Sequence, residues 1–301
     1  MNSSHAPLQA VADRWNLLFF ARRSMPIAGV IRICYGTLLL INMLCLAPYL
    51  ELWFTEAGPI PLAAARAILD PDAWIPFSWL PNSDSALTVW LSFTVMLVQI
   101  VCLIAGFYAR FQAASIFFWL VAFHHRNVLL FDGEDVLFRL LAFYLIWLPA
   151  GAYFALDALN DQRPVSERRY PVWPLRLLQI QMTLVYLSTL GEKLRGTDWF
   201  DGTALYYVSR LDDLFGRFPL PSAVLDCLTC LKVASWSVML VEFLIPCLLW
   251  NRRTRLLGLA LAVPFHLGID YSMNLNLFHW IMLTGLLSFV DWNPRSPGNL
   301  T

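Results

Sequence analysis

The chain has 301 residues, of which 58% are hydrophobic and only 14% are charged. Soluble domains carry about 25% charged residues, so this composition excludes an ordinary soluble protein, a disordered chain and a secreted disulfide scaffold. The 21 basic residues balance the 21 acidic ones, which leaves no net charge to attract nucleic acid. A mean hydropathy of +0.59 indicates that the lipid bilayer is the partner of this protein.

The chain contains apolar runs of the length that crosses a bilayer as a helix, which takes about 20 residues. In chain order, the predicted spans cover 26–50, 85–109, 111–130, 136–156, 175–193, 233–250, 256–269 and 271–290. The runs are continuous rather than alternating, which favours helices over strands. We therefore predict an all-α fold, a polytopic membrane helix bundle of about eight transmembrane helices. The first long loop, 51–84, has turn-forming stretches at Gly58-Pro59-Ile60-Pro61 and Asp70-Pro71, with a short amphipathic helix predicted from Leu62 to Leu69.

One membrane domain over residues 1–301 accounts for the whole chain, because no stretch resembles a second soluble domain. The predicted spans separate a polar N-terminal segment, 1–25, and two long loops, 51–84 and 194–231. Basic residues prefer the cytoplasmic side, and counting them on alternate loops places their excess on the side of the N-terminus. We predict a cytoplasmic N-terminus and put both long loops on the outer side. The short single-domain form favours the inner membrane of a bacterium.

One polar stripe runs along the predicted helix 175–193. Gln179, Thr183, Tyr186 and Lys193 follow one another at intervals of four, three and seven residues, so they share one face of the helix. Such a face turns toward the interior of a bundle. Burial favours the neutral amine of Lys193, which is the form that abstracts a proton. The alternative is a lysine that ends the helix and reaches the polar headgroups.

Ionisable groups inside predicted spans mark the next candidates, because each costs about 3 kcal/mol at membrane depth unless it is paired or functional. His266 is either a core histidine or a member of a polar site. We interpret Glu242 as a structural acid that pairs with a base on another helix, such as Arg32. The predicted orientation brings Glu134, His266 and Lys193 to the outer half of the membrane.

Metal and redox motifs give weaker signals. His124 and His125 diverge by about 100° on a helix, so we predict no metal site. Cys227 and Cys230 have the CxxC spacing of redox sites and could form a disulfide in an oxidising compartment, but we interpret them as two small buried residues. The sequence has no phosphate-binding loop and no hydrolase motif, which leaves nucleotide-binding and hydrolase functions without support.

Four stretches of the chain match one known pattern in the same order. These stretches are Phe54 to Pro61, Leu140 to Phe143, Tyr186 to Gly202 with its Lys193 and Asp198-Trp199, and Phe265-His266 through Phe278 to Met282-Leu283. Together they resemble the HTTM family, the membrane domain shared with vitamin K-dependent gamma-glutamyl carboxylase. The resemblance covers about residues 30 to 292 and implies the fold of that family.

The resemblance also implies a mechanism and a set of site residues. In the carboxylase, the lysine similar to Lys193 deprotonates reduced vitamin K, which oxygen converts to a strong base that removes a proton from glutamate, so that carbon dioxide can add. The implied cofactor is therefore a reduced vitamin K-type quinone such as menaquinol, and no metal is expected. The predicted site residues are catalytic Lys193, Glu134 and His266, with Tyr186, Trp199 and Phe278 binding the cofactor.

Two departures from the carboxylase limit this expectation. Where that enzyme has an Asn-His pair before its fourth helix, this chain has Gly133-Glu134, and a carboxylate near Lys193 would favour the charged amine. The sequence ends at Thr301, without a counterpart of the carboxylase's large outer domain, so we do not expect this chain alone to carboxylate a protein.

Three functions follow as hypotheses. The leading one is a quinol-dependent membrane enzyme, a carboxylase-like lyase or oxidoreductase that modifies an exported peptide or a small substrate. The second is a non-catalytic membrane partner for maturation or export of a secreted peptide, because some short family members resemble a membrane component needed to produce an exported peptide toxin. The third is a lipid or small-molecule transporter.

Overall fold

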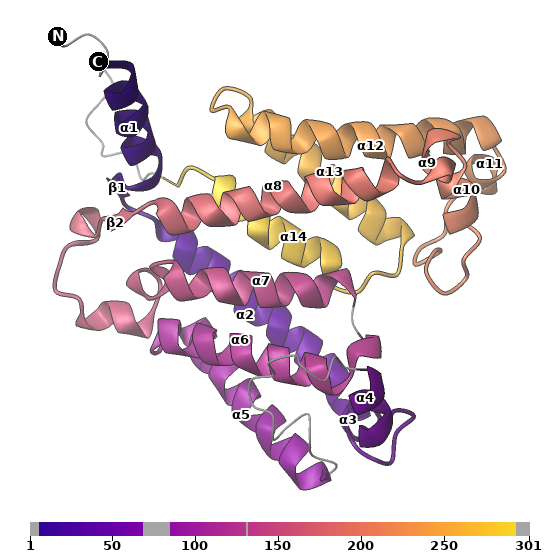
Figure 1. Cartoon of the computed structure of the whole chain (residues 1–301), viewed down its shortest axis with the longest axis horizontal. Coiled ribbons are helices and arrows are strands. Elements are labelled where there is room, and N and C mark those ends of the chain that lie inside the picture. The colour runs from indigo at the N-terminus through magenta and orange to yellow at the C-terminus, as the bar shows by residue number, and fades with distance from the viewer. Residues whose placement is uncertain (1–5, 69–84, 131, 293–301) are drawn as a thin grey trace. The chain divides into compact units, whose positions relative to one another are not determined.

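The chain folds almost entirely into α-helix. The computed structural model describes residues 6–68, 85–130 and 132–292, and Figure 1 shows the helices that they form. Two short strands, β1 (Arg22–Arg23) and β2 (Tyr170–Pro171), pair antiparallel and make the one sheet within these described ranges. The all-α prediction is therefore confirmed.

The chain is divided into two compact units. The first holds residues 1–178 and 290–301, and the second holds residues 179–289. The helix α8 (Trp173–Lys193) begins in the first unit and continues in the second. The single domain over residues 1–301 stays a prediction.

The first unit contains the helices of the N-terminal half. They are α1 (Ala6–Phe19), α2 (Pro26–Leu46), α3 (Leu50–Phe54), α4 (Leu62–Ile68), α5 (Ala86–Ala105), α6 (Ala109–Arg126) and α7 (Gly133–Trp147). Single 3-10 turns lie at Ala47–Tyr49, Val128–Leu130, Ala150–Ala152, Leu156–Asn160 and Val165–Glu167. The helix α4 confirms the short helix predicted from Leu62, whereas Leu69, Asp70-Pro71 and the rest of 69–84 lie outside the described residues.

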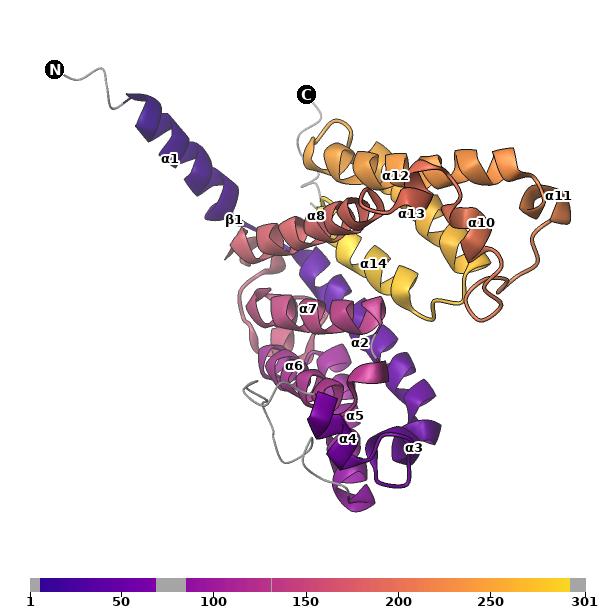
Figure 2. The same cartoon turned by 45° about the vertical axis from the view of Figure 1, so that its right-hand side comes forward.

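The second unit contains the end of α8 and the helices that follow it. They are α9 (Thr197–Phe200), α10 (Ala204–Val208), α11 (Ser222–Leu225), α12 (Leu228–Trp250), α13 (Arg255–Ser272) and α14 (Phe278–Leu286), followed by a 3-10 turn, Leu287–Phe289. The helices α12 and α13 pack side by side (Figure 2). They approach closely at Gly258, where a Cβ would lie 3.0 Å from the side chain of Leu248. The predicted loop 194–231 thus carries three short helices.

Three helical segments of the described chain are long and apolar enough to cross a membrane, judged by length and composition. They are Pro26–Phe54, Ala86–Ala105 and Leu228–Trp250. All three coincide with predicted spans. The remaining predicted spans correspond to α6, α7, α8, α13 and α14, and the count of about eight is not confirmed.

The exposed faces of these helices are as apolar as their buried faces. In α5, Phe93, Met96 and Ile100 are buried, while Leu91 and Val98 on the opposite face are more than half exposed. Large exposed apolar patches are rare on soluble proteins, and acyl chains cover such a face in a bilayer. This distribution indicates a membrane protein.

Two predicted helix ends differ most from the structure, and the local backbone explains both. The span predicted over 136–156 ends at Trp147, because Leu148 precedes a proline and adopts an extended conformation with ψ 145°. The span predicted over 271–290 begins only at Phe278. Its first two residues are the last two of α13, which ends because Met273 is extended with ψ 144°. Asn276 follows with a φ of 38°, a conformation that asparagine tolerates better than most residues.

Arg32 is fully buried in the first unit, where its side chain forms hydrogen bonds with the backbone of two segments. Its guanidinium donates hydrogen bonds to the carbonyl oxygens of Ile104, Ala150, Tyr153 and Phe154, at 2.5 to 3.3 Å. These bonds join the end of α5 to the segment that follows α7. The interpretation that Glu242 pairs with Arg32 is therefore wrong, since Glu242 forms its ion pair with Lys193.

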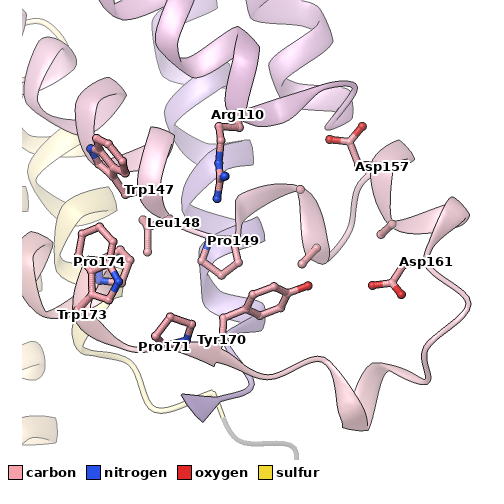
Figure 3. A pocket seen from close by; sticks show the side chains of 13 residues that line it. Arg110, Trp147, Leu148, Pro149, Asp157, Asp161, Tyr170, Pro171, Trp173 and Pro174 are labelled. Atoms are coloured by element: carbon pink, nitrogen blue, oxygen red, sulfur yellow. The ribbon is translucent and has the colours of Figure 1, made fainter. Parts of the chain in front are cut away.

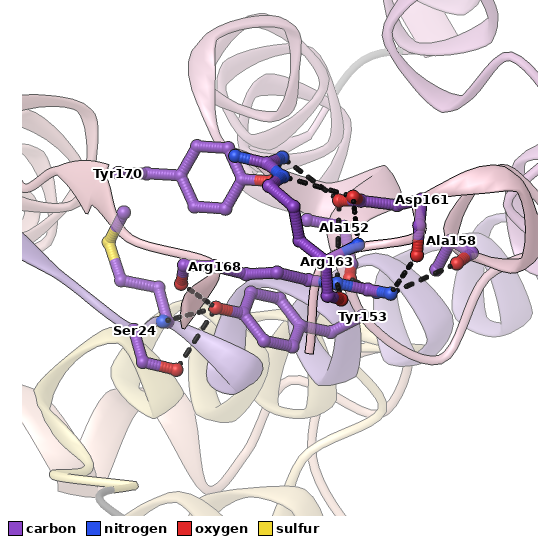
Figure 4. Close-up of polar contacts among 9 residues, drawn as sticks. Ser24, Ala152, Tyr153, Ala158, Asp161, Arg163, Arg168 and Tyr170 are labelled. Atoms are coloured by element: carbon purple, nitrogen blue, oxygen red, sulfur yellow. Dashed lines mark hydrogen bonds and ion pairs between the residues drawn. The ribbon is translucent and has the colours of Figure 1, made fainter. Parts of the chain in front are cut away.

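Arg168 holds the connection between α7 and α8 in the same way (Figure 4). Its guanidinium donates to the carbonyl oxygens of Ala152, Ala158, Asp161 and Arg163, at 2.8 to 3.2 Å. The hydroxyl of Tyr153 donates to the carbonyl of Arg168 at 2.5 Å and accepts from Ser24. Hydrogen bonds from Arg163 lower the pKa of Asp161 to about 2. The connection between α7 and α8 is therefore held in place by side-chain hydrogen bonds to its backbone.

Candidate functional site

Lys193 ends α8 and forms an ion pair with Glu242 of α12. The Lys193 side chain is 20% exposed and that of Glu242 is 8% exposed. The Nζ atom of Lys193 also lies 5.0 Å from the centre of the Trp199 ring. A carboxylate and an aromatic face both stabilise an ammonium group in a partly dry site.

A second polar chain joins three helices of the same unit. The hydroxyl of Tyr186, on α8, lies 2.6 Å from Nε2 of His266, on α13. The other ring nitrogen of His266, Nδ1, lies 3.0 Å from Nδ1 of His279, on α14. All three side chains are buried. Each ring nitrogen can donate or accept, so the hydrogen bonds can run in either direction along the chain. Reversing them takes up one proton at the Tyr186 oxygen and releases one from Nε2 of His279, or the opposite. The chain has the connectivity of a proton relay.

The two polar groups lie in one neighbourhood, which we call the polar centre: Lys193, Glu242, Trp199, Tyr186, His266 and His279. Glu242 is close enough to Tyr186 to interact with it electrostatically. Two buried polar atoms of the polar centre, Oε2 of Glu242 and Nε2 of His279, have no hydrogen-bond partner among the described residues. A buried polar atom without a partner costs about 1–3 kcal/mol, so each marks a position where a bound polar group would be stabilised.

The polar stripe predicted on α8 faces the interior of the second unit, as expected. Gln179 donates to the carbonyl of Ser288, at 2.6 Å, and Thr183 accepts from the indole of Trp250. Tyr186 and Lys193 continue the same face into the polar centre. Helical periodicity therefore identified this face correctly.

The structure brings most of the predicted site residues into one unit, but in two groups. Lys193 lies with Trp199, and Tyr186 lies with His266. Phe278 packs edge-on against the ring of its neighbour His279. The predicted catalytic Glu134 belongs to the first unit, where it is buried in the first turn of α7 and its backbone N–H donates to Asp132.

Two members of the polar centre are absent from the predicted site. Glu242 was assigned to a different partner, and His279 was not among the predicted site residues. A sequence signal for Glu242 exists, because an acid inside an apolar span requires a base and Lys193 is one of few available. Among the described residues, no group of three or more His, Cys, Asp or Glu side chains could hold a metal ion.

A cavity of about 490 Å³ lies elsewhere, in the first unit (Figure 3). Arg110 points into it between Trp147 and Tyr170. Asp157, at its edge, accepts hydrogen bonds from the backbone N–H groups of Tyr108 and Ala109. None of the described residues that line this cavity belongs to the predicted site.

The family model of the HTTM domain matches residues 22–293 of the chain. The chain belongs to the HTTM family. This confirms the family resemblance and, with the apolar helices, a membrane protein. The sporulation-delaying protein SdpB of Bacillus subtilis (strain 168) is 22% identical over 260 residues, which cover 83% of this HTTM protein and 79% of SdpB. No solved structure matches the chain.

Proposed function

We propose that this HTTM protein is a membrane enzyme of the gamma-carboxylase type, in which Lys193 and Glu242 act as an acid–base pair on a reduced quinone. The observation that carries the proposal is the ion pair itself. It places a carboxylate on the lysine that resembles the family's base, in a polar centre that also contains a relay of three hydrogen-bonded groups.

Lys193 and Glu242 can share one proton in two ways. As ammonium and carboxylate they attract each other at contact distance. As amine and carboxylic acid they avoid the cost of keeping two charges in a medium of low dielectric. In the second form, the amine of Lys193 accepts a proton from an acidic hydroxyl while Glu242 keeps the proton that Lys193 released. An ion pair is therefore compatible with the role of a base.

The unpartnered atoms of the polar centre fit a quinol. Oε2 of Glu242 can accept from a hydroxyl, and Nε2 of His279 can donate to an oxygen when it carries the proton. Trp199 and Phe278 would contact the ring. The bound quinol supplies, with oxygen, the strong base that removes a proton from carbon. We propose that the substrate is an exported peptide or a small molecule, reached from the outer side of a bacterial inner membrane with the N-terminus in the cytoplasm.

Oxygen uptake by the purified protein in nanodiscs, supplied with a reduced naphthoquinone, tests this proposal. Lys193→Ala and Lys193→Arg should both abolish uptake, because arginine keeps the ion pair but does not give up its proton. Glu192→Gln, in an exposed pair with Arg195, is the matched control and should retain it. Uptake that stays at background level in every protein would contradict the proposal.

A non-catalytic role is the second candidate, and one observation favours it. The ion pair satisfies the charge of Lys193 without any ligand, so the pair can serve to hold α8 against α12. In that case the protein would assist the maturation or export of a secreted peptide together with a companion protein. Lys193→Arg would then support production of the peptide, whereas an enzyme would lose it. A transporter has less support, since α12 and α13 continue as helices past Pro246 and Pro264.

A further inference from the structure

A disulfide joins Cys227 and Cys230 at the beginning of α12. Cys227 is the N-cap residue of this 23-residue helix, and its Sγ accepts a hydrogen bond from the backbone N–H of Cys230, at 3.3 Å. Cys230 is exposed and Cys227 is half-buried. The interpretation of these cysteines as two small buried residues is therefore wrong.

The disulfide contributes little to holding the fold. It closes a loop of two intervening residues within one helical turn, and the hydrogen bond from Leu231 N–H to the Cys227 carbonyl, at 3.0 Å, closes the same turn. Disulfides stabilise mainly by closing long loops in the unfolded chain. The preceding segment is held to α12 by other bonds, from the N–H of Leu205 to Ser235 Oγ and from the indole of Trp236 to the carbonyl of Phe200.

The position of the pair favours reaction with a thiol. The N-terminus of a long helix stabilises a thiolate, and Cys227 is the N-cap residue of α12. Asp226 is the one acidic neighbour in sequence on that side and opposes this effect. A thiolate that is stabilised at Cys227 is a good leaving group, and Cys230 is the sulfur open to attack.

The surface beside the pair is apolar. The side chains of Val224 and Leu228, on either side of Cys227, are 44% and 48% exposed. Such side chains can contact an extended polypeptide while its cysteine reaches Cys230. On the predicted orientation, this end of α12 faces the outer side, where disulfides persist.

We propose that Cys227–Cys230 is a thiol–disulfide exchange site for a cysteine-containing polypeptide. A thiolate of the polypeptide attacks Sγ of Cys230, the bond between the two cysteines breaks, and Cys227 leaves as the thiolate. A second thiolate of the polypeptide then attacks its own sulfur in the mixed disulfide and releases Cys230. The polypeptide gains a disulfide, and the two electrons and two protons that it loses leave Cys227 and Cys230 as thiols. The proposal does not depend on Lys193.

The test uses the full chain in nanodiscs, with Cys34, Cys45, Cys102 and Cys247 replaced by serine, so that any free thiol comes from Cys227 or Cys230. The protein is incubated with a synthetic peptide that carries two thiols, or with reduced glutathione, and its free thiols are counted by mass after maleimide labelling. We expect both cysteines to become labelled, the peptide to gain one disulfide, and the thermal unfolding temperature to stay unchanged.

Three results would overturn the proposal. The first is that the pair is reduced only after the protein unfolds. The second is that reduction lowers the unfolding temperature, as it does for a structural disulfide. The third is that glutathione reacts and the peptide does not, which would exclude a polypeptide as the substrate. In Cys227→Ser, the remaining thiol should form a mixed disulfide with the oxidised peptide, and the absence of this adduct would count against the proposal too. Oxygen uptake with a quinol should be the same for Cys227→Ser and the parent, which separates this site from the polar centre.

Discussion

Lys193 and Glu242 form an ion pair between the last residue of α8 and the middle of α12, although 49 positions separate them in the sequence. Water reaches little of either side chain, so solvent compensates only a small part of either charge. The pair therefore fixes where the end of α8 lies on α12, and it determines the charge that any bound molecule meets there.

Removing one member of this pair should destabilise the protein more than removing both. Glu242→Ala leaves an unpaired ammonium in a partly buried site, and we expect the free energy of unfolding to fall by about 3–5 kcal/mol. The double variant Lys193→Met, Glu242→Leu contains no unpaired charge and should lose less. Thermal unfolding in detergent measures both, with Glu192→Gln as a control that should change by at most about 0.5 kcal/mol. A Glu242→Ala protein as stable as the parent would show that the ion pair contributes nothing to stability.

Tyr186→Phe should measure what the hydrogen bond to His266 contributes to stability, separately from the packing of the ring. The substitution keeps the aromatic ring and leaves one nitrogen of His266 without its partner, so we expect a loss of about 1–3 kcal/mol in the free energy of unfolding. Tyr207→Phe is a suitable control, because the Tyr207 side chain is exposed and should change stability little. Equal unfolding temperatures for the two variants would contradict a buried Tyr186–His266 bond.

Arg32→Met should be among the most damaging substitutions in the first unit. It removes the donor to four carbonyl oxygens that the guanidinium satisfies, and we expect a loss of at least about 3 kcal/mol, seen as poor yield and early thermal unfolding. Arg110→Met changes an exposed arginine in the same unit and should fold like the parent. Comparable losses in the two variants would refute this role for Arg32.

Asp161 should make stability depend on pH in the acid range. Its pKa falls from 3.8 to about 2 in the folded protein, through hydrogen bonds from Arg163, so the folded state prefers the carboxylate. The stabilisation is complete above the pKa of the unfolded chain and is lost as the pH falls toward 2. The difference in unfolding temperature between the parent and Asp161→Asn should therefore stay constant above about pH 5 and shrink as the pH falls toward 2. A difference that does not change with pH would contradict this assignment.

Several features of the fold could be predicted because they depend on local sequence. Apolar runs identified α2, α5 and α12, because the helix length and the hydropathy that a bilayer requires can be read from the sequence alone. Helix ends were less certain. The end of α7 depends on Pro149, and the end of α13 depends on the extended conformation of Met273, neither of which changes the hydropathy of the run.

The sequence by itself determined which face of α8 is polar, because helical periodicity places Gln179, Tyr186 and Lys193 on one side. Only the tertiary structure decided what that face meets. Glu242, His266 and His279 come from three other helices, and periodicity within one helix contains no information about its neighbours. The same reason explains why Arg32 was assigned an acidic partner: a buried guanidinium needs acceptors, and whether these are carboxylates or backbone carbonyls depends on how the chain packs around it.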